Sequence, residues 1–253
     1  MTRVAAWQCR PGTRDLAGNL QRLDPACASA AARGAQVLVT PEMFTSGYAL
    51  APGDLRHLAE DPGGPTEAAV AAIARRHGIA VVYGHPERAP GGGTGDGGTG
   101  DGRAYNAATM IGADGAVLGR HRKIRLFGEH DRRLFLENPE PPAAFGGFGG
   151  IRVGMLICYD VEFGEPVRCL AADGARAILV PTANMTGYQE VPRSLVRARA
   201  RENGCGVVYA NYCGADEAFA YGGLSVICGP AGEVLAQAGP ADEELLIADL
   251  FPP

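Results

Sequence analysis

The chain has 253 residues, of which 46% are hydrophobic and 20% charged, a balance typical of a soluble globular protein. Its net charge of -5 at pH 7 argues against a general nucleic-acid-binding protein. No apolar stretch approaches the roughly 18 residues that cross a bilayer, and the N-terminal apolar run is too short for a secretory signal. We therefore expect a cytoplasmic protein with neither a membrane nor a nucleic acid as partner.

Two halves of the chain resemble each other. The segment RVAAWQC (3–9) resembles RVGMLIC (152–158), and AAARGAQVLVTPEM (30–43) resembles LAADGARAILVPTANM (170–185). Each half predicts a strand, a helix, a Gly-Ala turn and a second strand. The apolar, β-branched runs QVLV and AILV are typical of strands covered on both faces.

The remaining elements continue this alternation of helices and strands. Between the halves we predict a helix (68–78), a strand (79–84) and a hairpin (105–123). After the second half we predict a helix (194–204), a strand (205–212), a hairpin (223–239) and a last strand (244–250). Pro25 falls inside the first helix, which we expect to kink or to restart with Asp24 as its cap. No domain boundary is visible, so we expect one α/β domain over residues 1–253, with 90–103 as a flexible Gly-rich surface loop.

The seven cysteines form neither a disulfide framework nor a zinc site. Their number is odd, no pair is spaced CxxC, and no histidine lies at a zinc-like interval from any of them. We therefore expect reduced, mostly buried thiols and no metal. Cys158 stands apart, because it closes an apolar run and opens into an acidic, aromatic turn.

Reactive side chains follow several of the predicted strands. Glu42 comes after QVLVTP, Cys158 closes RVGMLI, Asn184 follows AILVPTA, and Lys123 follows the first hairpin. In open α/β sheets functional residues collect at the carboxyl ends of strands, and the repeat brings equivalent ends together. A thiol with a pKa of about 8.5 needs a base or a nearby cation before it attacks a carbonyl. Glu42 can take that proton, and Lys123 can favour the thiolate and stabilise an oxyanion.

Each of these residues also has an ordinary structural explanation. A cysteine at a strand end is more often a packing residue, a glutamate after Thr-Pro is more often a solvated turn residue, and a lysine within RHRK is more often a surface charge. The pattern of residue types alone does not decide between the two explanations.

A family resemblance favours the catalytic explanation over the structural one. The segments VLVTPEMFTSGY, HRKIRLFG and GMLICYDVEF resemble, in order, the three catalytic segments of the nitrilase superfamily of carbon–nitrogen hydrolases, and the resemblance extends from Arg3 to Leu250. It implies a four-layer αββα sandwich with internal pseudo-two-fold symmetry, assembled as a homodimer or higher homo-oligomer. It also implies Glu42 as general base, Lys123 as oxyanion stabiliser, Cys158 as nucleophile and Tyr159 as donor of an oxyanion-hole amide.

The same resemblance leaves other positions open. Family members often carry a second glutamate after the lysine; here Asp131 holds that place with a shorter arm, Glu129 shifts into it, or both belong to a charged surface turn. Asn184 and Met185 are expected to line the substrate pocket, because they follow the strand beside the nucleophile.

The nucleophile segment Cys158-Tyr159-Asp160 is similar to amidase branches of the superfamily, and the segment 180–217 is closer still to bacterial 5-aminopentanamidases and R-stereoselective amidases. The implied reaction converts a small primary amide to a carboxylate and ammonia through a thioester, with no cofactor. A cationic substrate tail requires an anion, and the candidates are Asp131, Glu129, Glu162, Glu190 and Asp216. Glu162, Glu165 and Arg168 are otherwise expected in a turn and at a subunit interface.

Three alternatives remain at this point. One is an N-carbamoyl amine hydrolase of the same superfamily, and another is a non-catalytic metabolite-binding relative. The third is a Cys-His hydrolase, although none of the five histidines follows Cys158.

Overall fold

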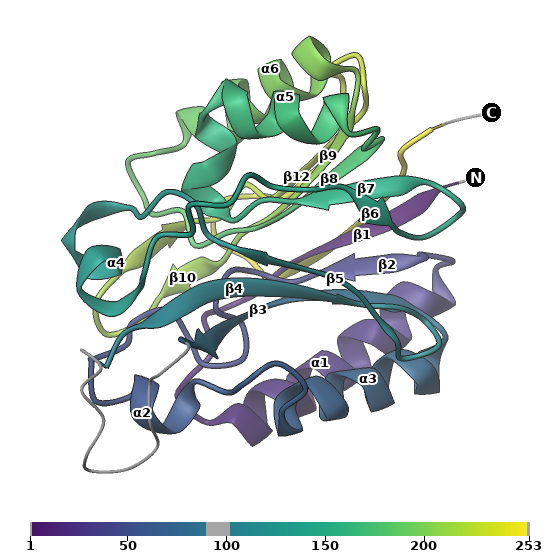
Figure 1. Cartoon of the computed structure of the whole chain (residues 1–253). Coiled ribbons are helices and arrows are strands. Elements are labelled where there is room, and N and C mark those ends of the chain that lie inside the picture. The colour runs from purple at the N-terminus through teal and green to yellow at the C-terminus, as the bar shows by residue number, and fades with distance from the viewer. Residues whose placement is uncertain (1, 90–101, 252–253) are drawn as a thin grey trace.

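The computed structural model describes residues 2–89 and 102–251, which contain two six-stranded sheets and a separate two-stranded hairpin (Figure 1). The first sheet has the order β14 (Glu244–Asp249), β1 (Arg3–Gln8), β2 (Val37–Val39), β3 (Ala80–Arg88), β4 (Ala104–Ile111), β5 (Val117–Arg122). The second has the order β13 (Val234–Gln237), β12 (Val226–Cys228), β9 (Gly206–Ala210), β8 (Ala177–Pro181), β7 (Arg152–Met155), β6 (Phe145–Gly146). The hairpin pairs β10 (Cys213–Ala215) with β11 (Ala220–Gly222).

Helices cover the outer faces of both sheets. The helices are α1 (Leu16–Ala32), α2 (Leu55–Leu58), α3 (Pro65–His77), α4 (Gly128–Leu134), α5 (Gly164–Ala172) and α6 (Val196–Asn203), with a 3-10 turn at Cys158–Glu162 and a π turn at Val191–Leu195. As Figure 1 shows, α1 and α3 lie together below the first sheet, and α5 and α6 lie together above the second. The order of layers is therefore helix, sheet, sheet, helix, and the predicted αββα sandwich is confirmed.

The two sheets are topologically equivalent. In the first, β1, β2 and β3 run parallel, with β14 and β4 antiparallel on either side. In the second, β7, β8 and β9 run parallel, with β6 and β12 antiparallel on either side. This correspondence is the internal pseudo-two-fold symmetry predicted from the repeated segments.

The central strands are apolar on both faces because each face meets a different layer. Successive side chains of a strand point to opposite faces. Val37 and Val39 therefore join the core between the sheets, while Leu38 joins the core between the first sheet and the helices α1 and α3. In β8, Leu179 likewise faces the other sheet, and Ile178 faces the helices. Continuous apolar runs are thus required at these positions.

One of the two outcomes predicted for the first helix is wrong. Helix α1 runs without interruption past Pro25, and it does not restart with Asp24 as its cap. The cap is Asp15, whose carboxylate accepts the Gly18 N–H at 3.1 Å, and Asp24 instead binds Arg76 and His77 from α3. The predicted flexible loop 90–103 lies outside the described residues from 90 to 101. No helix within the described ranges has the length and apolarity to span a membrane.

Candidate active site

Each of the predicted reactive residues follows the end of a strand, two in the first sheet, including its edge strand β5, and one in the second. Glu42 follows β2, Lys123 follows β5, and Cys158 follows β7. The Glu42 N–H donates to the carbonyl of Thr182, the residue after β8, at 3.2 Å, so the ends of β2 and β8 are joined across the sheets. The fold therefore brings one side chain from each of three distant segments into a single site.

Glu42 is fully buried, and its two carboxylate oxygens differ. Oε1 accepts hydrogen bonds from Lys123 Nζ and Asn106 Nδ2, each at 2.7 Å. Oε2 is buried without a hydrogen-bond partner among the described residues. Burial raises the pKa of Glu42, and the charge of Lys123 opposes this effect. Glu42 thus has one oxygen held in place and one free to accept a proton.

Lys123 lies between two buried carboxylates. Its Nζ donates to Glu42 Oε1 and to Asp131 Oδ2, both at 2.7 Å, and all three side chains are inaccessible to solvent. Burial alone would lower the pKa of Lys123, but the charges of Asp131 and Glu42 outweigh it and raise the pKa well above its ordinary value. Lys123 is therefore a permanent cation.

Asp131, and not Glu129, is the second acid of this cluster. Besides the contact with Lys123, Asp131 accepts the Tyr48 hydroxyl at Oδ1, at 2.7 Å, and the Phe127 N–H at Oδ2, at 2.9 Å. Both residues lie on α4, but Asp131 is buried on its inner side and Glu129 is exposed. The interpretation of these residues as a surface turn applies to Glu129 alone.

Cys158 occupies a sharp turn between β7 and the 3-10 turn that follows it. Its φ of 47° lies in the left-handed region, which a non-glycine residue adopts only under constraint, and its side chain is partly buried. Burial and the charge of Glu42 raise the pKa of the Cys158 thiol well above its ordinary value, while Lys123 and the backbone N–H of Ala183 act in the opposite direction. Burial thus disfavours the thiolate form of Cys158.

The family assignment follows from comparison with known proteins. Residues 3–252 match the family described as carbon-nitrogen hydrolase. The chain belongs to the carbon–nitrogen hydrolase family. This confirms the resemblance stated from the three catalytic segments.

Similar members of this family include hydrolases and amidases. A Pseudomonas protegens protein named "Hydrolase in pqqF 5'region" is 45% identical over 250 residues, covering 98% of this chain and 82% of that protein. An (R)-stereoselective amidase from Pseudomonas sp. is 34% identical over 226 residues, covering 89% and 76%. The amidase from Nesterenkonia sp. AN1, in a variant bound to butyramide, is 36% identical with a TM-score of 0.86, covering 98% and 90%.

Asp160 is a buried residue of this hydrolase that the sequence analysis used only as a mark of the amidase branch. Its carboxylate accepts the N–H groups of Ile157 at 3.1 Å, Ile124 at 3.1 Å and Arg125 at 2.8 Å, and lies 3.1 Å from Nε2 of His121. It thereby connects the turn that carries Cys158 to the segment that follows Lys123. In the sequence, the only indication of this connecting role is the position of Asp160 two residues after Cys158. Backbone hydrogen bonds leave no pattern in a sequence.

Asn184 and Tyr159 connect the site to surrounding loops. The Asn184 side chain donates to the Tyr188 carbonyl at 3.0 Å, and its N–H donates to Asn211 Oδ1 at 2.7 Å, so Asn184 holds the segment after β8. Met185, partly buried, pairs with Tyr221 of the β10–β11 hairpin. The Tyr159 ring packs edge-on against Phe127, with 5.2 Å between centroids.

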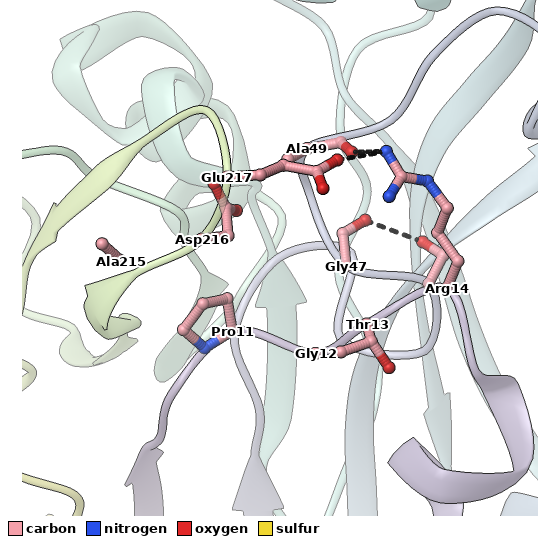
Figure 2. Close-up of a pocket in the computed structure, with 10 residues that line it drawn as sticks. Pro11, Gly12, Thr13, Arg14, Gly47, Ala49, Ala215, Asp216 and Glu217 are labelled. Carbon is pink, nitrogen blue, oxygen red and sulfur yellow. Dashed lines mark hydrogen bonds and ion pairs between the residues drawn. The ribbon is translucent and has the colours of Figure 1, made fainter.

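A separate cavity of about 230 Å³ lies between segments 11–14, 46–49 and 215–217 (Figure 2). It is lined by Pro11, Gly12, Thr13, Arg14, Ser46, Gly47, Ala49, Ala215, Asp216 and Glu217, so none of Glu42, Lys123 and Cys158 lines it. Arg14 donates to Glu217 at 2.5 Å and to the Ala49 carbonyl at 2.7 Å, which ties the cavity's walls together. Among the described residues no cluster of His, Cys, Asp and Glu side chains is arranged to hold a metal ion.

Proposed function

We propose that this carbon–nitrogen hydrolase is an amidase that converts small aliphatic primary amides, of the 5-aminopentanamide kind, to a carboxylate and ammonia. The proposal rests chiefly on one observation: the buried Glu42 keeps a free oxygen, Oε2, in a site where a constrained Cys158 and a fixed Lys123 cation meet. The similarity to two amidases supports it.

The first step is proton transfer from the thiol of Cys158 to Oε2 of Glu42. Burial disfavours both the carboxylate and the thiolate, so the transfer exchanges one buried anion for another without changing the charge of the site. Lys123 then lies beside a thiolate in a medium of low dielectric constant, where a nearby cation stabilises it strongly. In this scheme the thiolate forms only on proton transfer from Cys158 to Glu42.

The second step is attack of the Cys158 sulfur on the amide carbon. The carbonyl π pair moves to oxygen, and Lys123 Nζ with the backbone N–H of Tyr159 stabilises the oxyanion. Collapse of the intermediate breaks the carbon–nitrogen bond, and the leaving amine takes the proton from Glu42 and departs as ammonia. A thioester remains on Cys158.

Hydrolysis of the thioester repeats these steps with water as nucleophile. Glu42 accepts a proton from the water, which attacks the thioester carbon, and the carbon–sulfur bond then breaks to release the carboxylic acid. The thiolate regains its proton from Glu42. Asp131 acts through Lys123 in this scheme, because it fixes the position of Nζ without touching the reacting atoms.

The oligomeric state and the cellular location of the protein are part of the same proposal. We expect residues 1–253 to form one hydrolase domain of a cytoplasmic protein, and the family resemblance implies a homodimer or a higher homo-oligomer. Light scattering on the purified protein tests the dimer, and a monomeric mass would contradict it.

Ammonia release from an amide panel tests the function. The panel contains 5-aminopentanamide, a neutral aliphatic amide, an amino-acid amide and an N-carbamoyl amine. We expect turnover of primary amides and a loss of at least about 10⁴-fold in Cys158→Ala, because the nucleophile is removed. Turnover of only the N-carbamoyl amine would replace the proposal with a carbamoyl hydrolase.

Cys9→Ala is the matched control for the nucleophile. Cys9 holds the equivalent place after β1 in the first half, but it is completely buried, and burial raises the pKa of its thiol. We expect this variant to keep its activity. Equal activity of the wild type and Cys158→Ala would contradict the cysteine mechanism.

A further inference from the structure

The buried hydroxyl of Tyr48 belongs to the charge cluster around Lys123. Tyr48 is 2% exposed, and its Oη donates to Asp131 Oδ1 at 2.7 Å. Asp131 Oδ2 in turn accepts a hydrogen bond from Lys123 Nζ at 2.7 Å. Burial and the charge of Asp131 raise the pKa of Tyr48 well above its ordinary value, so the hydroxyl stays protonated and remains a donor. Two hydrogen bonds in sequence therefore connect Tyr48 to the cation.

The Tyr48 hydroxyl contacts the oxygen of Asp131 that Lys123 does not contact. Lys123 and the Phe127 N–H both bind Oδ2, whereas in the described part of the chain Tyr48 is the sole donor to Oδ1. Two bonds to one oxygen fix the carboxylate weakly, because the terminal torsion of an aspartate is broad. A third bond, at the other oxygen, fixes the plane of the carboxylate. Tyr48 therefore determines how Asp131 presents Oδ2 to the Lys123 ammonium.

Two aromatic side chains hold the Tyr48 ring. Its centroid lies 5.1 Å from that of His130 and 5.5 Å from that of Phe219, and the last two centroids are 5.0 Å apart. Tilted and edge-on rings at such spacings attract each other. His130 Nε2 also lies 3.0 Å from the Tyr48 carbonyl oxygen, and because a carbonyl oxygen only accepts, this nitrogen is the donor. The phenol is thus held at its ring and at its main chain, which fixes the direction of its hydroxyl.

Phe219 belongs to the loop that joins β10 to β11, and this hairpin reaches a second part of the site. The Asp216 carboxylate accepts the Phe219 N–H at 2.8 Å and the Tyr221 hydroxyl at 2.5 Å. Tyr221 pairs with Met185 of the segment that follows β8. One hairpin therefore packs both against Tyr48 and against the segment that we expect to line the substrate pocket.

We propose that Tyr48 is a positioning residue of the reaction, which acts through Asp131 to fix the Lys123 ammonium where the oxyanion forms. The ring of Phe219 keeps Tyr48 in place for this task. The inference rests on the proposed amidase function, since an oxyanion forms only when a carbonyl is attacked. Lys123 stabilises the charge of the transition state more than the neutral carbonyl of the bound substrate. A displaced ammonium therefore lowers kcat and leaves substrate binding nearly unchanged.

Tyr48→Phe tests the role of the hydroxyl, because it removes that group and keeps the ring. On the primary amide that wild type hydrolyses fastest, we expect kcat to fall about 5- to 30-fold with KM within about twofold of wild type. Butyraldehyde provides a second measurement. Its carbonyl carbon bonds to the Cys158 sulfur and its oxygen takes the thiol proton, so the adduct is tetrahedral like the intermediate. Its Ki should rise by the same factor as kcat/KM falls, whereas a structural role alone would reduce the amount of active enzyme and leave Ki unchanged.

Double variants test the order of action. Asp131→Ala removes both carboxylate oxygens, so the addition of Tyr48→Phe should change its kcat by less than about twofold. The same loss in both backgrounds would overturn the inference, because Tyr48 would then act by another route. Phe219→Leu keeps an apolar side chain without the ring, and it should lose about 2- to 5-fold in kcat, with no further loss when it is combined with Tyr48→Phe. If Asp131→Ala does not fold, the Ki of butyraldehyde for Tyr48→Phe decides.

Tyr105→Phe is the matched control. The Tyr105 ring lies 4.2 Å from the Arg122 guanidinium, and within the described residues its hydroxyl makes no hydrogen bond, so this variant should keep the kcat and the Ki of wild type. Wild-type kcat in Tyr48→Phe, or a lower kcat with an unchanged Ki, would overturn the inference alone, since wild type would still hydrolyse amides. A wild type inactive on every amide of the panel would overturn the proposed function, and this inference with it.

Discussion

At Lys123, two buried carboxylates hold one ammonium group, and they have different tasks. Asp131 uses both oxygens, for the Tyr48 hydroxyl at Oδ1 and for Lys123 and the Phe127 N–H at Oδ2. Glu42 keeps Oε2 free. Each hydrogen bond that a carboxylate accepts fixes the position of its donor. Asp131 is thus suited to positioning Lys123, while Glu42 has one oxygen without a partner.

This division of tasks predicts the effect of Asp131→Asn. The change removes one of the two charges that hold Lys123, so the pKa of Lys123 should fall from its raised value and Nζ should lose its fixed position. We expect kcat to fall about 10- to 100-fold, since small displacements of an oxyanion stabiliser are costly. Steady-state kinetics on the best amide measures it. Glu129→Gln, on the same helix but exposed, should keep wild-type kcat; a comparable loss there would contradict the assignment of Asp131.

The sequence could indicate the reactive residues but not all of their neighbours. Glu42, Lys123 and Cys158 follow recognisable strands and lie in segments that resemble a family. The choice between Asp131 and Glu129 depends on which side of the seven-residue helix α4 faces the protein interior. Neither residue type nor spacing determines that. Asp160 was overlooked as a connector because its partners are mostly backbone N–H groups, which every sequence contains.

Among the elements, β3 packs closely on the turn that carries Glu42. A Cβ atom on Gly84 would lie 2.4 Å from the Met43 backbone nitrogen and 2.9 Å from the Glu42 Cα. Met43 itself has a φ of 53°, so this turn is already held in an uncommon conformation. The missing side chain at Gly84 therefore allows the turn to pack directly on the strand.

Gly84→Ala should displace the Glu42 turn. We expect a loss of about 10- to 100-fold in kcat, because the general base moves relative to the thiol, and a loss of roughly 1–3 kcal/mol in the free energy of unfolding. Kinetics together with urea unfolding measures both. Gly53→Ala is the control, since a Cβ there meets nothing within 4 Å. If Gly84→Ala kept full kcat, precise placement of this turn would not be required for catalysis.

Elements with strong local patterns were predictable, and those decided by tertiary contacts were not. The apolar runs around Val37–Val39 and Ala177–Pro181 identified β2 and β8, because strands covered on both faces leave no polar position. Helix α1 differs: Pro25 predicted a kink or a restart at Asp24, but the helix does not restart there, and Asp24 binds Arg76 of α3. Packing here outweighs the local cost of proline, which a sequence pattern does not record.

For the whole molecule, the core between the two sheets joins the repeated halves. It contains Val37 and Val39 from the first half and Leu179 and Val208 from the second, all fully buried. The site likewise takes Glu42 and Lys123 from one half and Cys158 from the other. Separation of the sheets would therefore take the site apart and expose this core at the same time. Stability and catalysis should therefore depend on the same interface.

The single tryptophan makes this dependence measurable. Trp7 lies in β1 of the first sheet, whereas Leu179 lies in β8 of the second. Leu179→Ala leaves a cavity in the shared core, and we expect a loss of about 2–5 kcal/mol in the free energy of unfolding. The unfolding midpoint should fall equally by Trp7 fluorescence and by far-UV circular dichroism, although Trp7 is in the other half.

Val234→Ala is the control, at a position 41% exposed, and its free energy of unfolding should stay within about 0.5 kcal/mol of wild type. A fluorescence midpoint that stayed at the wild-type value while the dichroism midpoint fell would show that the halves unfold independently, and the single-domain proposal would then be wrong.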